Sequence, residues 1–166
     1  MKPTLVVAGI VLAAAVGARG WDAEAGQAKS QAELRKLVVG TWRLVSMEGG
    51  PATSIAARGA KPTGLIMYDA NGYMAAQIVP DRVRPKYTGV PTPEVAFEVL
   101  RGYTAYFGTY TIDEKTRTIT HHRQGMLDGG IVDYVRTFEF VPGDRIVLTT
   151  VTGTMPPTRL TWERVK

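Results

Sequence analysis

The chain has 166 residues, of which 45% are hydrophobic and 21% are charged, so it is long and apolar enough to bury the core of one domain. It contains no cysteine, which excludes disulfide bonds, cysteine-ligated metals and thiol nucleophiles. The formal net charge of +5 comes from scattered basic residues rather than a basic stripe with interleaved aromatic residues, so we expect no nucleic-acid partner.

The first twenty residues have the pattern of a secretory signal peptide. Lys2 provides a short positive region, Leu5 to Val16 form an apolar run, and small residues follow up to Gly20. The apolar run is shorter than the roughly 20 residues that a membrane-spanning helix needs. We therefore expect cleavage after Gly17 or Gly20, export to a bacterial periplasm or the medium, and no stable membrane insertion afterwards.

Residues 21–29 are small and polar, and we expect them to form a flexible leader to a domain over residues 30–166. Ser30 to Glu33 form a capping-box pattern, which predicts a short helix that Gly40 ends. Period-two alternation then predicts strands over residues 42–46, 64–68, 73–78, 103–112, 117–123, 131–140, 145–150 and 158–165.

The segments between these strands are rich in glycine and proline. Residues 51–62 are expected to be a loop, and Asp69 to Gly72 form a strong turn because Asn-Gly tolerates positive φ. Residues 80–93 hold four prolines and cannot be regular, and Thr92-Pro93-Glu94 predicts the start of a second short helix that ends near Arg101.

About eight strands in series with short turns favour an all-β fold, an up-and-down antiparallel barrel with a short N-terminal helix and a short helix after the third strand. Closing the sheet leaves no free edge. A barrel of this size encloses either its own side chains or one small ligand.

Several motifs run in order through residues 37–166. Gly40-Thr41-Trp42 resembles the Gly-x-Trp signature of lipocalins, and a wider set resembles the small bacterial and fungal lipocalin-like domain family, which has a calycin-type barrel. The wider set comprises residues 39–46, 64–68, 72–77, 106–111, 118–122 and 159–164.

The resemblance implies that Trp42 closes one end of the barrel and packs against an arginine of the last strand. Arg164 is the candidate, because it shares a face with Leu160 and Trp162, and Gly40 belongs to the same structural closure. Relatives include carriers of apolar molecules and proteins linked to biosynthetic pathways. Arg123 departs from the pattern, because an apolar residue is expected there.

Two polar residues are expected inside the barrel. Arg136 alternates with Tyr134 and Phe138 on the inward face of its strand, where it could hold a ligand anion, form an internal ion pair or cap an aromatic cluster. His121 shares the parity of inward-facing Ile119, and is either a ligand-binding or acid–base group or a hydrogen-bonded core group.

The polar ends of several other side chains complete a candidate pocket, in which a few polar groups stand in an apolar wall. The predicted ligand-binding residues are Tyr68, Gln77, Tyr106, Tyr110, His121, Tyr134 and Arg136. Adjacent His121 and His122 point to opposite faces of a strand and no third ligand is evident, so no metal site is expected. No phosphate-binding glycine motif is present either, and we expect no cofactor.

The sequence leaves three functions open. The favoured one is binding of a small, mainly apolar molecule with one acidic or polar group, with the segment 80–93 and the helix after it acting as a lid. The alternative is an isomerase or cyclase that uses His121 as acid or base and Arg136 to hold an enolate or carboxylate. The third is a structural domain with a filled core. The oligomeric state stays open.

Overall fold

The computed structural model describes residues 32–127, 129–130, 132–151 and 153–166. The predicted signal peptide, the leader and the cap at Ser30 lie outside these residues. The described part begins with an N-terminal helix, residues 32–38. No helix in these ranges has the length and apolar character to cross a membrane.

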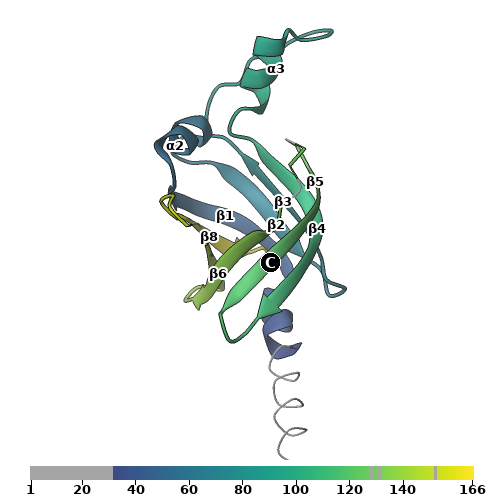
Figure 1. The fold of residues 1–166 in the computed structure, drawn as a ribbon, viewed down its shortest axis with the longest axis vertical. Coiled ribbons are helices and arrows are strands. Elements are labelled where there is room, and N and C mark those ends of the chain that lie inside the picture. Colours follow the sequence, from purple (N-terminus) through teal and green to yellow (C-terminus); the bar gives the residue numbers. More distant parts are fainter. Residues whose placement is uncertain (1–31, 128, 131, 152) are drawn as a thin grey trace, which may run out of the picture.

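The predicted barrel is confirmed. Eight antiparallel strands pair in sequence order, and β1 pairs with β8 to close the sheet (Figure 1). The structure gives the strand bounds as β1 Gly40–Gly49, β2 Thr63–Tyr68, β3 Tyr73–Val79, β4 Thr104–Asp113, β5 Thr118–Met126, β6 Tyr134–Val141, β7 Arg145–Thr150 and β8 Thr158–Arg164.

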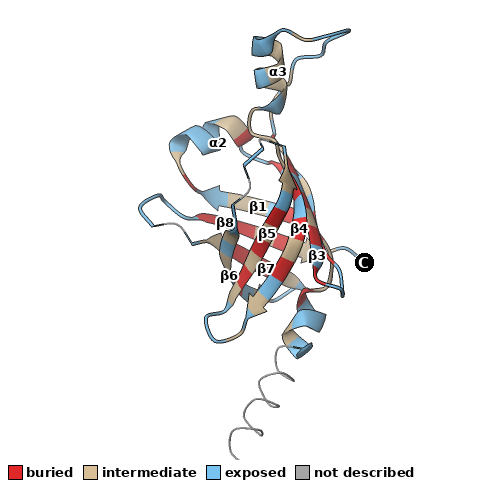
Figure 2. Ribbon diagram, turned by 45° about the vertical axis from the view of Figure 1, so that its right-hand side comes forward, coloured by how far each residue is buried: buried red, intermediate tan, exposed pale blue. Residues whose placement is uncertain are grey.

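Turn chemistry and alternation explain this arrangement. In the β2–β3 turn, the Asp69 carboxylate accepts hydrogen bonds from the backbone N–H groups of Asn71 and Tyr73, each at 2.8 Å. Gly72 has a φ of 95°, a conformation that glycine adopts without strain. Along the strands, buried residues alternate with more exposed ones, and the buried residues line the inside of the barrel (Figure 2).

Two short helices lie at one end of the barrel, α2 at Ala52–Arg58 and α3 at Pro93–Leu100. The start of α3 is as predicted, because the Thr92 side chain accepts from the backbone N–H of Val95. The expected loop over residues 51–62 is wrong, because an alanine-rich segment with Pro51 before it and Gly59 after it forms α2.

The predicted lid segment has little contact with the cavity. Helix α3 extends beyond α2 and away from the strands (Figure 1), and none of its residues is buried. Of residues 80–101 only Arg101 lines the cavity, whereas α2 contributes Thr53, Ser54, Ala57 and Arg58.

The opposite end is closed by Gly40, Trp42 and Arg164. Trp42 is buried, and its indole N–H donates to the carbonyl oxygen of Val38 at 2.9 Å. The Arg164 guanidinium lies 4.1 Å from the Trp42 ring centroid and donates to two backbone carbonyls at the end of the N-terminal helix. Gly40 has a φ of 141°, and a Cβ there would lie 2.5 Å from Arg164 Nη1.

Candidate functional site

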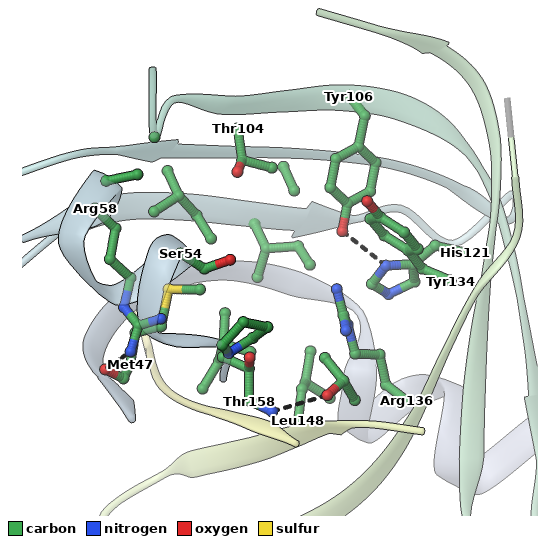
Figure 3. A pocket seen from close by; sticks show the side chains of 18 of the residues that line it. Met47, Ser54, Arg58, Thr104, Tyr106, His121, Tyr134, Arg136, Leu148 and Thr158 are labelled. Atoms are coloured by element: carbon green, nitrogen blue, oxygen red, sulfur yellow. Dashed lines mark hydrogen bonds between the residues drawn. The ribbon is translucent and has the colours of Figure 1, made fainter. Parts of the chain in front are cut away.

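The barrel encloses a cavity of about 780 Å³ that reaches the end covered by α2. This volume is in the range of small-molecule sites. Much of the wall is apolar, with contributions from Ile66, Ala76, Ile78, Leu148, Leu160 and Trp162. Polar groups gather on one side, from β4, β5 and β6, while Ser54 and Arg58 of α2 lie on the other (Figure 3).

His121 lies between two tyrosine hydroxyls. It is 0% exposed, with its Nε2 atom 2.7 Å from Tyr68 Oη and its Nδ1 atom 2.9 Å from Tyr106 Oη. Burial, reinforced by the positive charge of Arg136, lowers the pKa of His121 to about 3. The imidazole is therefore neutral at neutral pH, with both ring nitrogens engaged.

Arg136 points from β6 into the cavity toward Tyr106 and His121 (Figure 3). The side chain is half-buried, and its guanidinium carbon lies 4.9 Å from the ring centroid of Tyr134. Burial raises the pKa of the Tyr106 hydroxyl, and the positive charge of Arg136 opposes that rise.

Arg136 has no acidic partner within 4.0 Å among the described residues. The internal ion pair that the sequence left open is therefore not formed in this part of the chain. The contact with the Tyr134 ring agrees with the interpretation of Arg136 as a cap on an aromatic cluster. The guanidinium also faces the cavity, as a ligand clamp requires. The two remaining interpretations, ligand clamp and aromatic cap, are compatible with each other.

Arg123, which breaks the family pattern, is a second cation beside Tyr134, although it does not itself line the cavity. It is 4% exposed and points inward, two residues after His121 on β5. Its guanidinium carbon lies 3.5 Å from the Tyr134 ring centroid, and its Nε donates to the carbonyl oxygen of Val132. The Tyr134 ring thus contacts two guanidinium groups, and the cavity wall on this side holds the Arg136 guanidinium together with the Asp133 carboxylate.

The structure brings together four of the predicted pocket residues, Tyr106, His121, Tyr134 and Arg136, at the cavity wall. Tyr68 is buried behind His121 and does not line the cavity.

Besides Tyr68, two other predicted pocket residues lie outside the cavity wall. Tyr110 faces inward but lies toward the closed end, where its hydroxyl donates to the carbonyl oxygen of Asp69 at 2.8 Å. Gln77 is exposed on the outer face of β3, because Ala76 and Ile78 take the inward positions.

Arg58 is a cavity residue that the sequence reading missed. It is 5% exposed, and its Nη2 donates to the carbonyl oxygens of Met47 and Gly49 at 3.2 and 2.8 Å. Within the described part of the chain its Nε and Nη1 have no hydrogen-bond partner. Arg58 could have been found in the sequence if a helix had been predicted between Pro51 and Gly59. The direction of a helical side chain can be inferred only after the helix itself has been predicted.

Comparison with known proteins gives a family. The model of the lipocalin-like domain family matches residues 39–165. A search of curated proteins gave no match.

Solved structures with some similarity include a redesigned β-barrel, with 11% identity, 80% of this chain and 95% of that chain covered, and a TM-score of 0.43. A mutant of the fluorescent protein UnaG has 16% identity, coverage of 79% and 98%, and a TM-score of 0.38. Fatty-acid-binding protein 1 of Echinococcus granulosus has 13% identity, coverage of 79% and 99%, and a TM-score of 0.41. On the family match, which extends from the start of β1 to the end of β8, this chain belongs to the lipocalin-like domain family.

Proposed function

We propose that this protein binds a small, mainly apolar ligand in the barrel cavity and that Arg136 holds an acidic group of that ligand. The observation that carries the proposal is the half-buried guanidinium of Arg136, which faces a largely apolar cavity and has no carboxylate within 4.0 Å in the described residues. A buried charge is costly unless a counter-charge accompanies it, and a carboxylate or sulfonate can accept two N–H bonds from one guanidinium.

The geometry favours binding over catalysis by His121. An acid–base group needs a free nitrogen within reach of the substrate and a pKa near the working pH. Both nitrogens of His121 are engaged by tyrosines, and the pKa is lowered by burial to about 3. We therefore assign His121 to the support of the site.

The second histidine, His122, does not line the cavity. His122 Nε2 is 2.9 Å from Thr111 Oγ1, and its Nδ1 is 2.8 Å from Asp133 Oδ2. Asp133 lines the cavity but Thr111 and His122 do not, so the imidazole of His122 does not face the proposed ligand. The described residues also hold no group of three or more His, Cys, Asp or Glu side chains arranged to bind a metal.

The proposal includes export. Residues 1–20 have the order of a signal peptide, with a positive start, an apolar run and small residues before the expected cleavage sites. The ligand would then be encountered in a periplasm or in the medium.

Two matched probes test the proposed function. Anilinonaphthalene sulfonate (ANS) is an apolar molecule with one acidic group, and N-phenyl-naphthylamine (NPN) has the same rings without that group. Fluorescence titration of wild type and Arg136→Met should show ANS affinity reduced at least about tenfold, or roughly 1.4 kcal/mol, by the substitution. NPN affinity should be unchanged. Equal affinities of the variant and wild type for ANS would refute the role of Arg136.

Extraction of the native protein gives an independent check. Mass spectrometry of any co-purified compound should identify an apolar molecule with a carboxylate or a comparable anionic group. A co-purified cationic compound would contradict the proposal, because the Arg136 guanidinium would repel it.

A further inference from the structure

Tyr68, His121 and Tyr106 form a buried series of hydrogen bonds, and His121 restricts which tyrosine can donate a further hydrogen bond. A neutral imidazole carries one N–H and one lone pair, so one tyrosine donates to the ring and the other accepts from it. The two contacts, 2.7 Å at Nε2 and 2.9 Å at Nδ1, are both within hydrogen-bond distance. The hydrogen bonds of this series can therefore run in either of two directions, which we call its two polarities.

In the first polarity, Tyr68 donates to Nε2, and the Nδ1–H group donates to the Tyr106 oxygen. The Tyr106 O–H is then free to donate into the cavity, which Tyr106 lines. In the second polarity, Tyr106 donates to Nδ1 and the Nε2–H group donates to the Tyr68 oxygen. The Tyr68 O–H then has no acceptor within the series. Tyr68 is 2% exposed and does not line the cavity, so this leftover donor is buried away from any ligand.

When the cavity holds no anion, the positive charge of Arg136 disfavours the first polarity. A guanidinium next to Tyr106 favours lone pairs on that side of His121, which is the second polarity. An anion beside Arg136 removes this preference and supplies the acceptor that the Tyr106 O–H lacks. Binding of an acidic ligand therefore selects the first polarity.

We infer, building on the proposed function, that the acidic group is held by two donors, the Arg136 guanidinium and the Tyr106 hydroxyl. Tyr68 and His121 act as positioning residues that make Tyr106 a donor. The ligand class follows from this pair: an oxyanion with several acceptor lone pairs, such as a carboxylate, and not an amine or another group that presents donors.

Tyrosine-to-phenylalanine variants test the two-donor site with the same probes. Tyr106→Phe should weaken ANS binding at least about tenfold, the loss expected for one hydrogen bond to a charged group. Tyr68→Phe should weaken ANS binding to a smaller extent, although Tyr68 does not touch the cavity. Neither change should alter NPN affinity. Tyr110→Phe is the matched control, because its hydroxyl is bonded to Asp69 outside the site, and it should leave both affinities unchanged.

The failures of the two proposals are distinguishable. If Arg136→Met weakens ANS binding and Tyr106→Phe does not, the two-donor site is refuted and the proposed function stands. If ANS does not bind the wild type, or no variant changes its affinity, the proposed function itself is refuted.

A second measurement uses the wild-type protein and does not depend on the folding of a variant. In protein labelled with ¹⁵N-histidine and saturated with ANS, NMR correlation spectra report which ring nitrogen of His121 carries the proton. We expect the proton on Nδ1 in the ANS complex. A proton on Nε2, or on both nitrogens, would overturn the inferred polarity.

Discussion

Replacing Arg136 by methionine should change the stability of the ligand-free protein very little. The substitution removes a contact with the Tyr134 ring at 4.9 Å, worth about 0.5–1 kcal/mol. It also removes a half-buried charge that has no acidic partner in the described residues, which offsets part of that loss. The net change in the free energy of unfolding should be within about 1 kcal/mol.

The assay is equilibrium unfolding in urea, in which a shift of the midpoint at constant slope reports stability. Arg164→Met is the matched control, because Arg164 packs on Trp42, pairs with Asp144 at 3.1 Å and donates to two backbone carbonyls. It should lose about 3 kcal/mol. A loss of about 3 kcal/mol or more for Arg136→Met would refute the reasoning, because a loss that large indicates an acidic group stranded by the substitution.

Four further outcomes are expected. Trp42→Ala should lower the free energy of unfolding by about 3–5 kcal/mol in the same urea assay, because a fully buried ring is removed. Gly40→Ala should cost about 1–3 kcal/mol, because its φ of 141° and the 2.5 Å approach to a guanidinium nitrogen leave no room for a Cβ, and an unchanged midpoint would contradict this. Stability should fall as the pH decreases from 6.5 toward about 3, because the unfolded chain protonates His121 in this window and the folded protein does not. This component is at most about 5 kcal/mol and should be missing in His121→Gln. Mass spectrometry of native protein should find a mature N-terminus near Ala18 or Trp21, whereas intact Met1 would count against export.

Alternation was sufficient to place side chains inside or outside the barrel where one face of a strand is plainly apolar. Arg136 could be placed inside because Phe138 shares its parity, and His121 because Ile119 does. The strands were recognisable because turn residues separate them, as at Asp69 to Gly72, where Gly72 takes the positive φ that the Asn-Gly pair predicts.

The position of a residue along the barrel axis was harder to predict than the face of the strand on which it lies. This position depends on the stagger of neighbouring strands. Tyr110 faces inward as its parity with Tyr106 suggests, but it lies toward the closed end and not in the cavity. Gln77 was misplaced because small and apolar residues occupy both faces of β3. Arg58 could not be assigned a role before α2 was recognised.

A crystal structure of the protein with ANS would test the central claim most directly. The account predicts that the naphthalene and phenyl rings lie in the cavity against Ile66 and Leu148, with sulfonate oxygens within hydrogen-bond distance of Arg136 and Tyr106. ANS bound on the outer surface of the barrel, or bound in the cavity with its sulfonate away from Arg136, would contradict it.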